Sequence, residues 1–158
     1  MKKNSLLPGI VSIVALLAIV AALLLPLGTG LISTIGNIAE PAAGYDFVFG
    51  NDALLINDPH GAMIAWFVLL LIAAFFGLVG SITGFFGGKV GAFFDFVTGL
   101  ITLASTILFF LSATIVGQTW VGEVSLGWGY IAAGASSAFA TLLFLFVGGK
   151  GLFAKKAY

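Results

Sequence analysis

The sequence has no cysteine and no arginine, and only 8% of its 158 residues are charged. Without cysteine, the chain forms no disulfide, holds no metal through thiolate and carries no cysteine nucleophile. Without arginine, it lacks the forked guanidinium that most often grips phosphate or carboxylate groups. A soluble domain has charge on about a quarter of its residues. The composition therefore excludes a soluble domain and predicts an integral membrane protein.

What the sequence has in abundance is apolar residues, which make up 61% of the chain. About twenty consecutive apolar residues cross the hydrocarbon core of a bilayer as a helix. Four runs reach that length, and they predict an all-α membrane protein with one domain over residues 1–158, a four-helix transmembrane bundle. The expected spans cover residues 6–27, 59–82, 92–116 and 126–147, with an outer loop at 37–58. Because Pro26 breaks the helical pattern, the first helix either stops near Leu27 or continues with a kink to about Ile35.

The charges predict an orientation. Four spans place both termini and the turn around Lys89 on one side, and that side then holds every lysine (Lys2, Lys3, Lys89, Lys150, Lys155, Lys156). Lysine-rich loops face the cytoplasm, so both termini are expected to be cytoplasmic. Trp66, Trp120, Trp128 and Tyr130 fall near the opposite interface, as an aromatic belt would. We expect a multi-pass protein of the cell membrane. The absence of cysteine and of glycosylation sequons favours a bacterial inner membrane.

The first outer loop contains a short alternating stretch. Tyr45, Phe47 and Phe49 alternate with other residues, Gly50-Asn51-Asp52 offers turn chemistry, and Ala53–Ile56 is a second apolar run. This pattern predicts a small β-hairpin. Its aromatic residues either form an outer docking surface for a partner or fold down onto the ends of the spans.

Small residues recur at helical spacing within the spans. Because lipid is as apolar as leucine, membrane helices associate through close backbone packing and interhelical hydrogen bonds. We expect helix-packing positions at Gly77, Gly80, Gly84, Gly91, Gly134, Ser137 and Thr141. A sharper alternative is that the hydroxyls of Thr98, Thr102, Ser105 and Thr141 line a polar path.

Asp95 is the one acidic residue inside a predicted span, which makes it a candidate for ion or proton handling together with Thr98 and Thr102. The alternative is a structural carboxylate near the inner interface that meets the positive end of the helix dipole. His60 and Asp58 are too few to bind a metal, so no metal site is expected. Gly87–Gly91 lacks the order of a phosphate-binding loop, and no cofactor is expected.

These features favour a non-enzymatic interaction or accessory subunit of a larger membrane assembly. Its expected partners are the lipid bilayer and other membrane proteins or further copies of the chain, not nucleic acid. The alternative is a small oligomeric transporter or pore subunit that uses Asp95 and the stripe Thr98, Thr102 and Ser105. The layout is similar in outline to claudin-type four-span proteins. Their first-loop tryptophan and paired cysteines are absent, which leaves a likeness of layout alone.

Overall fold

The computed structural model describes residues 6–28, 32–35, 44–50, 61–86, 88–119, 124–126 and 128–153. Its elements are α1 (Leu6–Gly28), β1 (Ile32–Ile35), α2 (Gly44–Phe49), α3 (Gly61–Phe86), α4 (Lys89–Thr119), β2 (Val124–Leu126) and α5 (Trp128–Phe153). Four of the helices, α1, α3, α4 and α5, contain stretches long and apolar enough to cross a membrane. The prediction of a four-helix bundle is confirmed.

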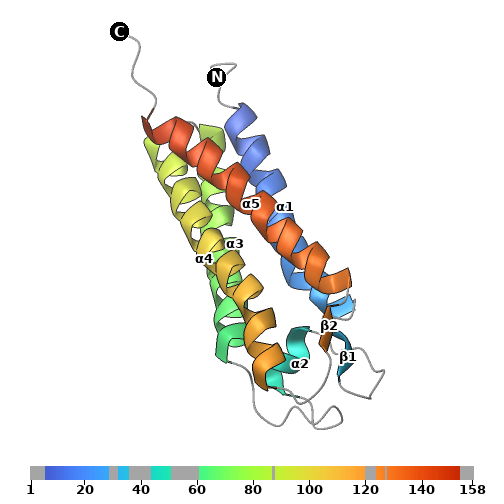
Figure 1. Cartoon of the computed structure of the whole chain (residues 1–158). Helices are drawn as coiled ribbons and strands as arrows, with labels where there is room; N and C mark the ends of the chain where they lie inside the picture. The colour runs from blue at the N-terminus through green and yellow to red at the C-terminus, as the bar shows by residue number, and fades with distance from the viewer. Residues whose placement is uncertain are drawn as a thin grey trace.

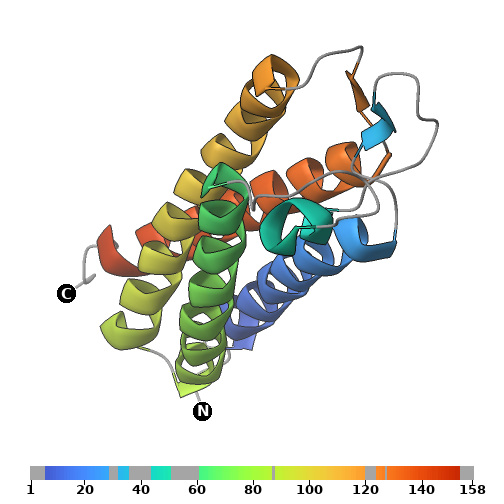
Figure 2. The same cartoon turned by 90° about the horizontal axis from the view of Figure 1, so that it is seen from below.

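The four long helices form a ring in the order α1, α3, α4, α5. Each packs mainly against its two neighbours in that ring, so α1 and α4 occupy opposite corners, as do α3 and α5. Figure 1 shows that the first turn of α1, the last turn of α5 and the connection between α3 and α4 lie at one end of the bundle. We call this the glycine end, for the contacts described below. Helix α2 and the two strands lie at the opposite end, the loop end (Figure 2).

The connection between α3 and α4 is shorter than the sequence predicts. Spans were expected to stop at 82 and restart at 92, whereas α3 continues to Phe86 and α4 begins at Lys89. Gly88 has a φ of 139°, a conformation that side-chain-bearing residues rarely adopt, and this glycine reverses the chain. Gly84 and Gly91, which lie just outside the expected span limits, both belong to helices.

Backbones approach one another closely at the glycine end. A Cβ at Gly91 would lie 2.9 Å from the backbone nitrogen of Gly84, and a Cβ at Gly84 would lie 3.4 Å from Cα of Gly9. These three glycines thus bring α4, α3 and α1 together with no side chain between them. Such close approach gains dispersion contacts along the backbones, which is the attraction available to helices in lipid.

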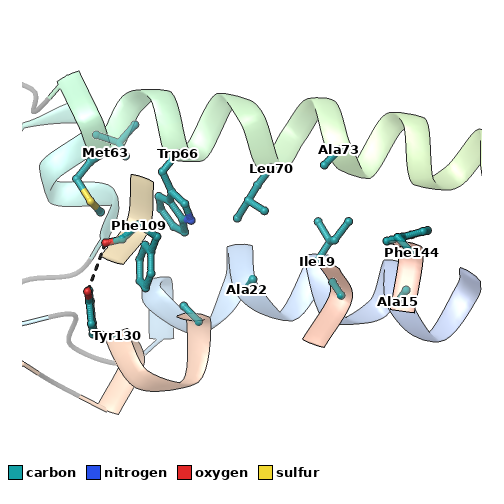
Figure 3. Packing of buried hydrophobic residues seen from close by; sticks show 13 residues of the cluster. Ala15, Ile19, Ala22, Met63, Trp66, Leu70, Ala73, Phe109, Tyr130 and Phe144 are labelled. Atoms are coloured by element: carbon teal, nitrogen blue, oxygen red, sulfur yellow. Dashed lines mark hydrogen bonds between the residues drawn. The ribbon is translucent and has the colours of Figure 1, made fainter. Parts of the chain in front are cut away.

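Large side chains fill the rest of the interior (Figure 3). Ile19, Leu70 and Phe144 lie along its middle, and toward the loop end the rings of Trp66, Phe109 and Tyr130 pack against one another in that order. The ring centroids of Trp66 and Phe109 are 5.0 Å apart, and those of Phe109 and Tyr130 are 4.7 Å apart. Trp66 and Tyr130 are buried, so the structure does not place them in an outward-facing aromatic belt. Trp128 is 79% exposed, as a belt residue would be.

The strand prediction at Tyr45–Phe49 is wrong, because these residues belong to helix α2. Five alternating residues fit one turn of helix as well as a strand. The backbone N–H of Gly50 donates to the carbonyl oxygen of Asp46 at 2.8 Å and ends the helix, with Gly50 at a φ of 84°. Val48 is buried in the core cluster and holds α2 against the bundle. The second predicted strand, Ala53–Ile56, lies outside the described residues.

The two strands come from connections between helices that are far apart in the sequence. β1 follows α1 and runs antiparallel to β2, which precedes α5, with Ile35 opposite Val124 and Ile32 opposite Leu126. The helix therefore stops at Gly28, close to Leu27, and a kinked helical extension to Ile35 is wrong. This pairing fixes the end of α1 beside the start of α5 and closes the ring at the loop end.

Two adjacent glycines of α5 provide a test of this packing. A Cβ at residue 148 would overlap the backbone nitrogen and Cα of Phe96, whereas a Cβ at residue 149 meets nothing within 4 Å. We predict that Gly148→Ala lowers the free energy of unfolding in detergent by about 1–3 kcal/mol, since α5 must move away from α4. Gly149→Ala should be neutral or stabilising by up to about 1 kcal/mol. Equal stabilities for the two variants would contradict the packing described.

Candidate functional site

The interior polar site is centred on Asp95. This residue lies in the second turn of α4 and is 1% exposed. Its carboxyl group fits because residue 80 on α3 is glycine: a Cβ there would overlap Oδ1 of Asp95. Because α4 begins at Lys89 and the helix-dipole effect fades beyond the first turn, the dipole contributes little here. The carboxyl group is instead inserted between helices.

Asp95 reaches across the bundle to Ser12 of α1. Oγ of Ser12 lies 2.8 Å from Oδ2 of Asp95 and 3.0 Å from the carbonyl oxygen of Pro8, one turn earlier in α1. Ser12 is fully buried. Since α1 and α4 are at opposite corners of the ring, this contact links two helices that otherwise scarcely touch. The other carboxyl oxygen, Oδ1, has no hydrogen-bond partner within the described part of the chain.

The hydroxyls that could line a polar path are mostly bound to their own helix. Thr98 donates to the carbonyl oxygen of Phe94 at 2.8 Å, and Thr102 donates to that of Thr98 at 2.9 Å. On α5, Thr141 donates to the carbonyl oxygen of Ser137 at 2.9 Å. A hydroxyl has one hydrogen to donate, so these groups have none left for a water or an anion and could meet a cation only through an oxygen lone pair. Their hydrogen bonds fit a packing role better than a path.

Hydroxyls of α4 also make contacts with the neighbouring helices. Ser105 of α4 donates to the carbonyl oxygen of Trp66 on α3 at 3.3 Å. Oγ1 of Thr106 meets Oγ of Ser137 on α5, and Thr106 also lies 2.7 Å from the carbonyl oxygen of Thr102. These contacts join α4 to both of its neighbours in the middle of the bundle, where interhelical hydrogen bonds supply specificity that apolar contact lacks.

The small residues predicted at helix contacts are all buried, at Gly77, Gly80, Gly84, Gly91, Gly134, Ser137 and Thr141. They face other helices of the same chain. Gly77 admits the ring of Phe144 from the opposite corner, with a Cβ position 3.0 Å from that ring, and Gly134 packs against the ring of Phe110. These positions are therefore occupied within the bundle and do not present an open groove to a second protein.

The predicted outer docking residues are only partly described. Phe49 is 65% exposed at the end of α2, where its ring meets the edge of Phe67 with centroids 5.9 Å apart. The side chains of Tyr45 and Phe47 lie outside the described part. His60, Asp58 and the remaining loop acids also lie outside it. Among the residues that the structure describes, no group of three His, Cys, Asp or Glu side chains could hold a metal ion.

Sequence reasoning missed Ser12, the partner of Asp95. A single serine in an apolar run of twenty residues gives no pattern to follow, and the two residues are separated by 83 positions. No pattern in the sequence pointed to Gly9 or Gly99 either. A Cβ at Gly9 would meet the ring of Phe85 on α3, and a Cβ at Gly99 would meet Leu145 on α5. The weak signal available was that Ser12 is the one polar side chain of that run.

Comparison with protein-family models, with curated proteins and with solved structures finds no match to this chain. The function is therefore argued from the contacts above.

Proposed function

We propose that this chain is a multi-pass membrane protein that acts without catalysis, as an interaction or accessory subunit of a larger assembly in the cell membrane. The observation that carries the proposal is the closed interior of the described bundle. Its small residues receive neighbouring helices, its hydroxyls bond mostly to backbone carbonyls, and bulky side chains fill the space between. A protein with such an interior acts through its outer surface.

That surface has two kinds of region. Along the long helices it is formed by large apolar side chains such as Leu17, Phe75 and Leu142, each more than 60% exposed. Such a surface suits the surrounding lipid, which is as apolar as leucine. At the loop end, Phe49 projects from a helix that Val48 anchors, which suits docking of a partner outside the membrane.

In the proposed orientation the glycine end faces the cytoplasm. The exposed Lys89 is the first residue of α4 and the exposed Lys150 is in the last turn of α5, which puts both at that end, as the preference of lysine for cytoplasmic loops requires. Single cysteines can test the orientation, since the chain has none of its own. We predict that a membrane-impermeant thiol reagent labels Phe49→Cys in intact cells and Lys89→Cys only in inverted vesicles.

The control for labelling is Ala140→Cys, which is fully buried and should stay unlabelled from either side. Labelling of positions 49 and 89 from the same side would contradict the orientation. Recovery of the chain in the soluble fraction would contradict membrane insertion.

The partner hypothesis is tested by extraction in mild detergent, native sizing and mass spectrometry. We predict that the chain elutes in a defined complex with other membrane proteins. Phe49→Ala should weaken that complex, whereas Phe75→Ala should leave it intact, although both side chains are 65% exposed. Phe75 is the matched control because it lies on the long helix α3, away from the loop end. A lone monomer in every detergent would contradict the proposal.

A second candidate is a small oligomeric transporter or pore subunit that uses Asp95 with Thr98, Thr102 and Ser105. The observation in its favour is the buried carboxyl oxygen of Asp95 that has no partner within the described residues. The hydroxyls beside it count against the candidate because they bond to backbone carbonyls. A homogeneous homo-oligomer without other proteins in the sizing experiment would favour this candidate over the first.

A further inference from the structure

We propose that Asp95 is a proton-binding site: in the closed bundle its carboxyl group is neutral, and it donates its proton to Oγ of Ser12, which in turn donates to the carbonyl oxygen of Pro8. The site takes no ligand other than the proton. It is independent of whether the chain is an accessory subunit, since it rests on contacts within one chain.

Hydrogen-bond counting at Ser12 leads to this assignment. Oγ of Ser12 is within hydrogen-bond distance of two acceptors, Oδ2 of Asp95 and the carbonyl oxygen of Pro8. A serine hydroxyl has one hydrogen. If Asp95 is ionised, this hydrogen is the one donor that the described residues offer to the buried carboxylate, and Oδ1 has none. If Asp95 carries a proton, the carboxyl O–H donates to Oγ of Ser12, and the Ser12 hydroxyl donates to the carbonyl oxygen of Pro8. Both hydrogens then have an acceptor.

The surroundings of the carboxyl group also favour the neutral form. An ionised carboxylate needs a counter-ion or several donors when it is buried. The described parts of α1 and α3 carry no ionisable side chain. Helix α4 contributes Lys89 and α5 contributes Lys150 and Tyr130; both lysines are exposed, and the Tyr130 hydroxyl is directed to carbonyl oxygens of α4 near the loop end. None of these groups pairs with Asp95 in the structure.

The second carboxyl oxygen fits the same picture. Oδ1 lies against the backbone of Gly80 and receives no hydrogen bond from any described residue. In a carboxylate this oxygen would carry half of an uncompensated charge, whereas in the neutral acid it is a carbonyl oxygen, whose burial costs far less.

Infrared spectroscopy of the full-length chain in lipid vesicles tests the proposal. A protonated carboxyl has a C=O stretching band well separated from that of a carboxylate, and the band moves in D₂O. We predict such a band at neutral pH in the wild-type chain and its loss in Asp95→Asn. The asparagine amide can still donate to Ser12, which preserves the fold. A wild-type minus Asp95→Asn difference that contains only carboxylate bands overturns the proposal.

Two serine variants assign the band independently of Asp95→Asn and decide the question if that variant does not fold. Ser12→Ala should move the band to higher frequency, because the carboxyl proton loses its acceptor. Ser81→Ala is the matched control: Ser81 is also buried but donates to the carbonyl oxygen of Gly77 in its own helix. The control should leave the band in place. A band that responds equally to both substitutions, or to neither, overturns the proposal.

Discussion

The structure depends on backbone contact between α1, α3 and α4 at the glycine end. There Gly9, Gly84 and Gly91 let three helices meet without intervening side chains. In a bilayer, apolar side chains have no reason to prefer one another over lipid, so contact of this kind would hold the helices there. It also places Ser12, which lies three residues after Gly9 in α1, within reach of Asp95 on α4. The contact between Ser12 and Asp95 thus follows from the glycine contacts and adds a polar link between α1 and α4.

The two ends of the bundle are built differently, and this difference gives the molecule a direction. The glycine end is joined by backbone contact and by one buried carboxyl group. Toward the loop end, the packed rings of Trp66, Phe109 and Tyr130 fill the interior, and the paired strands fix α1 beside α5. Figure 1 shows the pair α1 and α5 diverging from the pair α3 and α4 in this direction. Wide side chains there take the place that glycine contacts occupy at the other end.

The sequence predicted the four helices because long apolar runs have no other stable form in a membrane. It failed where a signal was short or distant. The five alternating residues at Tyr45–Phe49 fit helix and strand alike, and packing of Val48 decided for helix. Trp66 looked like an interface residue from its position, yet it is buried, since exposure depends on which helix face meets a neighbour. The contact of Ser12 with Asp95 requires the arrangement of the helices, which no spacing within one helix reveals.

Ser12 and Asp95 together join α1 to α4. A double-mutant cycle of Ser12→Ala and Asp95→Ala, read as the free energy of unfolding in detergent, measures that interaction directly. We predict that the two losses are not additive, with a favourable interaction energy of about 0.5–3 kcal/mol between the residues. Losses that add to within about 0.3–0.5 kcal/mol would show that the two side chains act independently and that they do not join the two helices together.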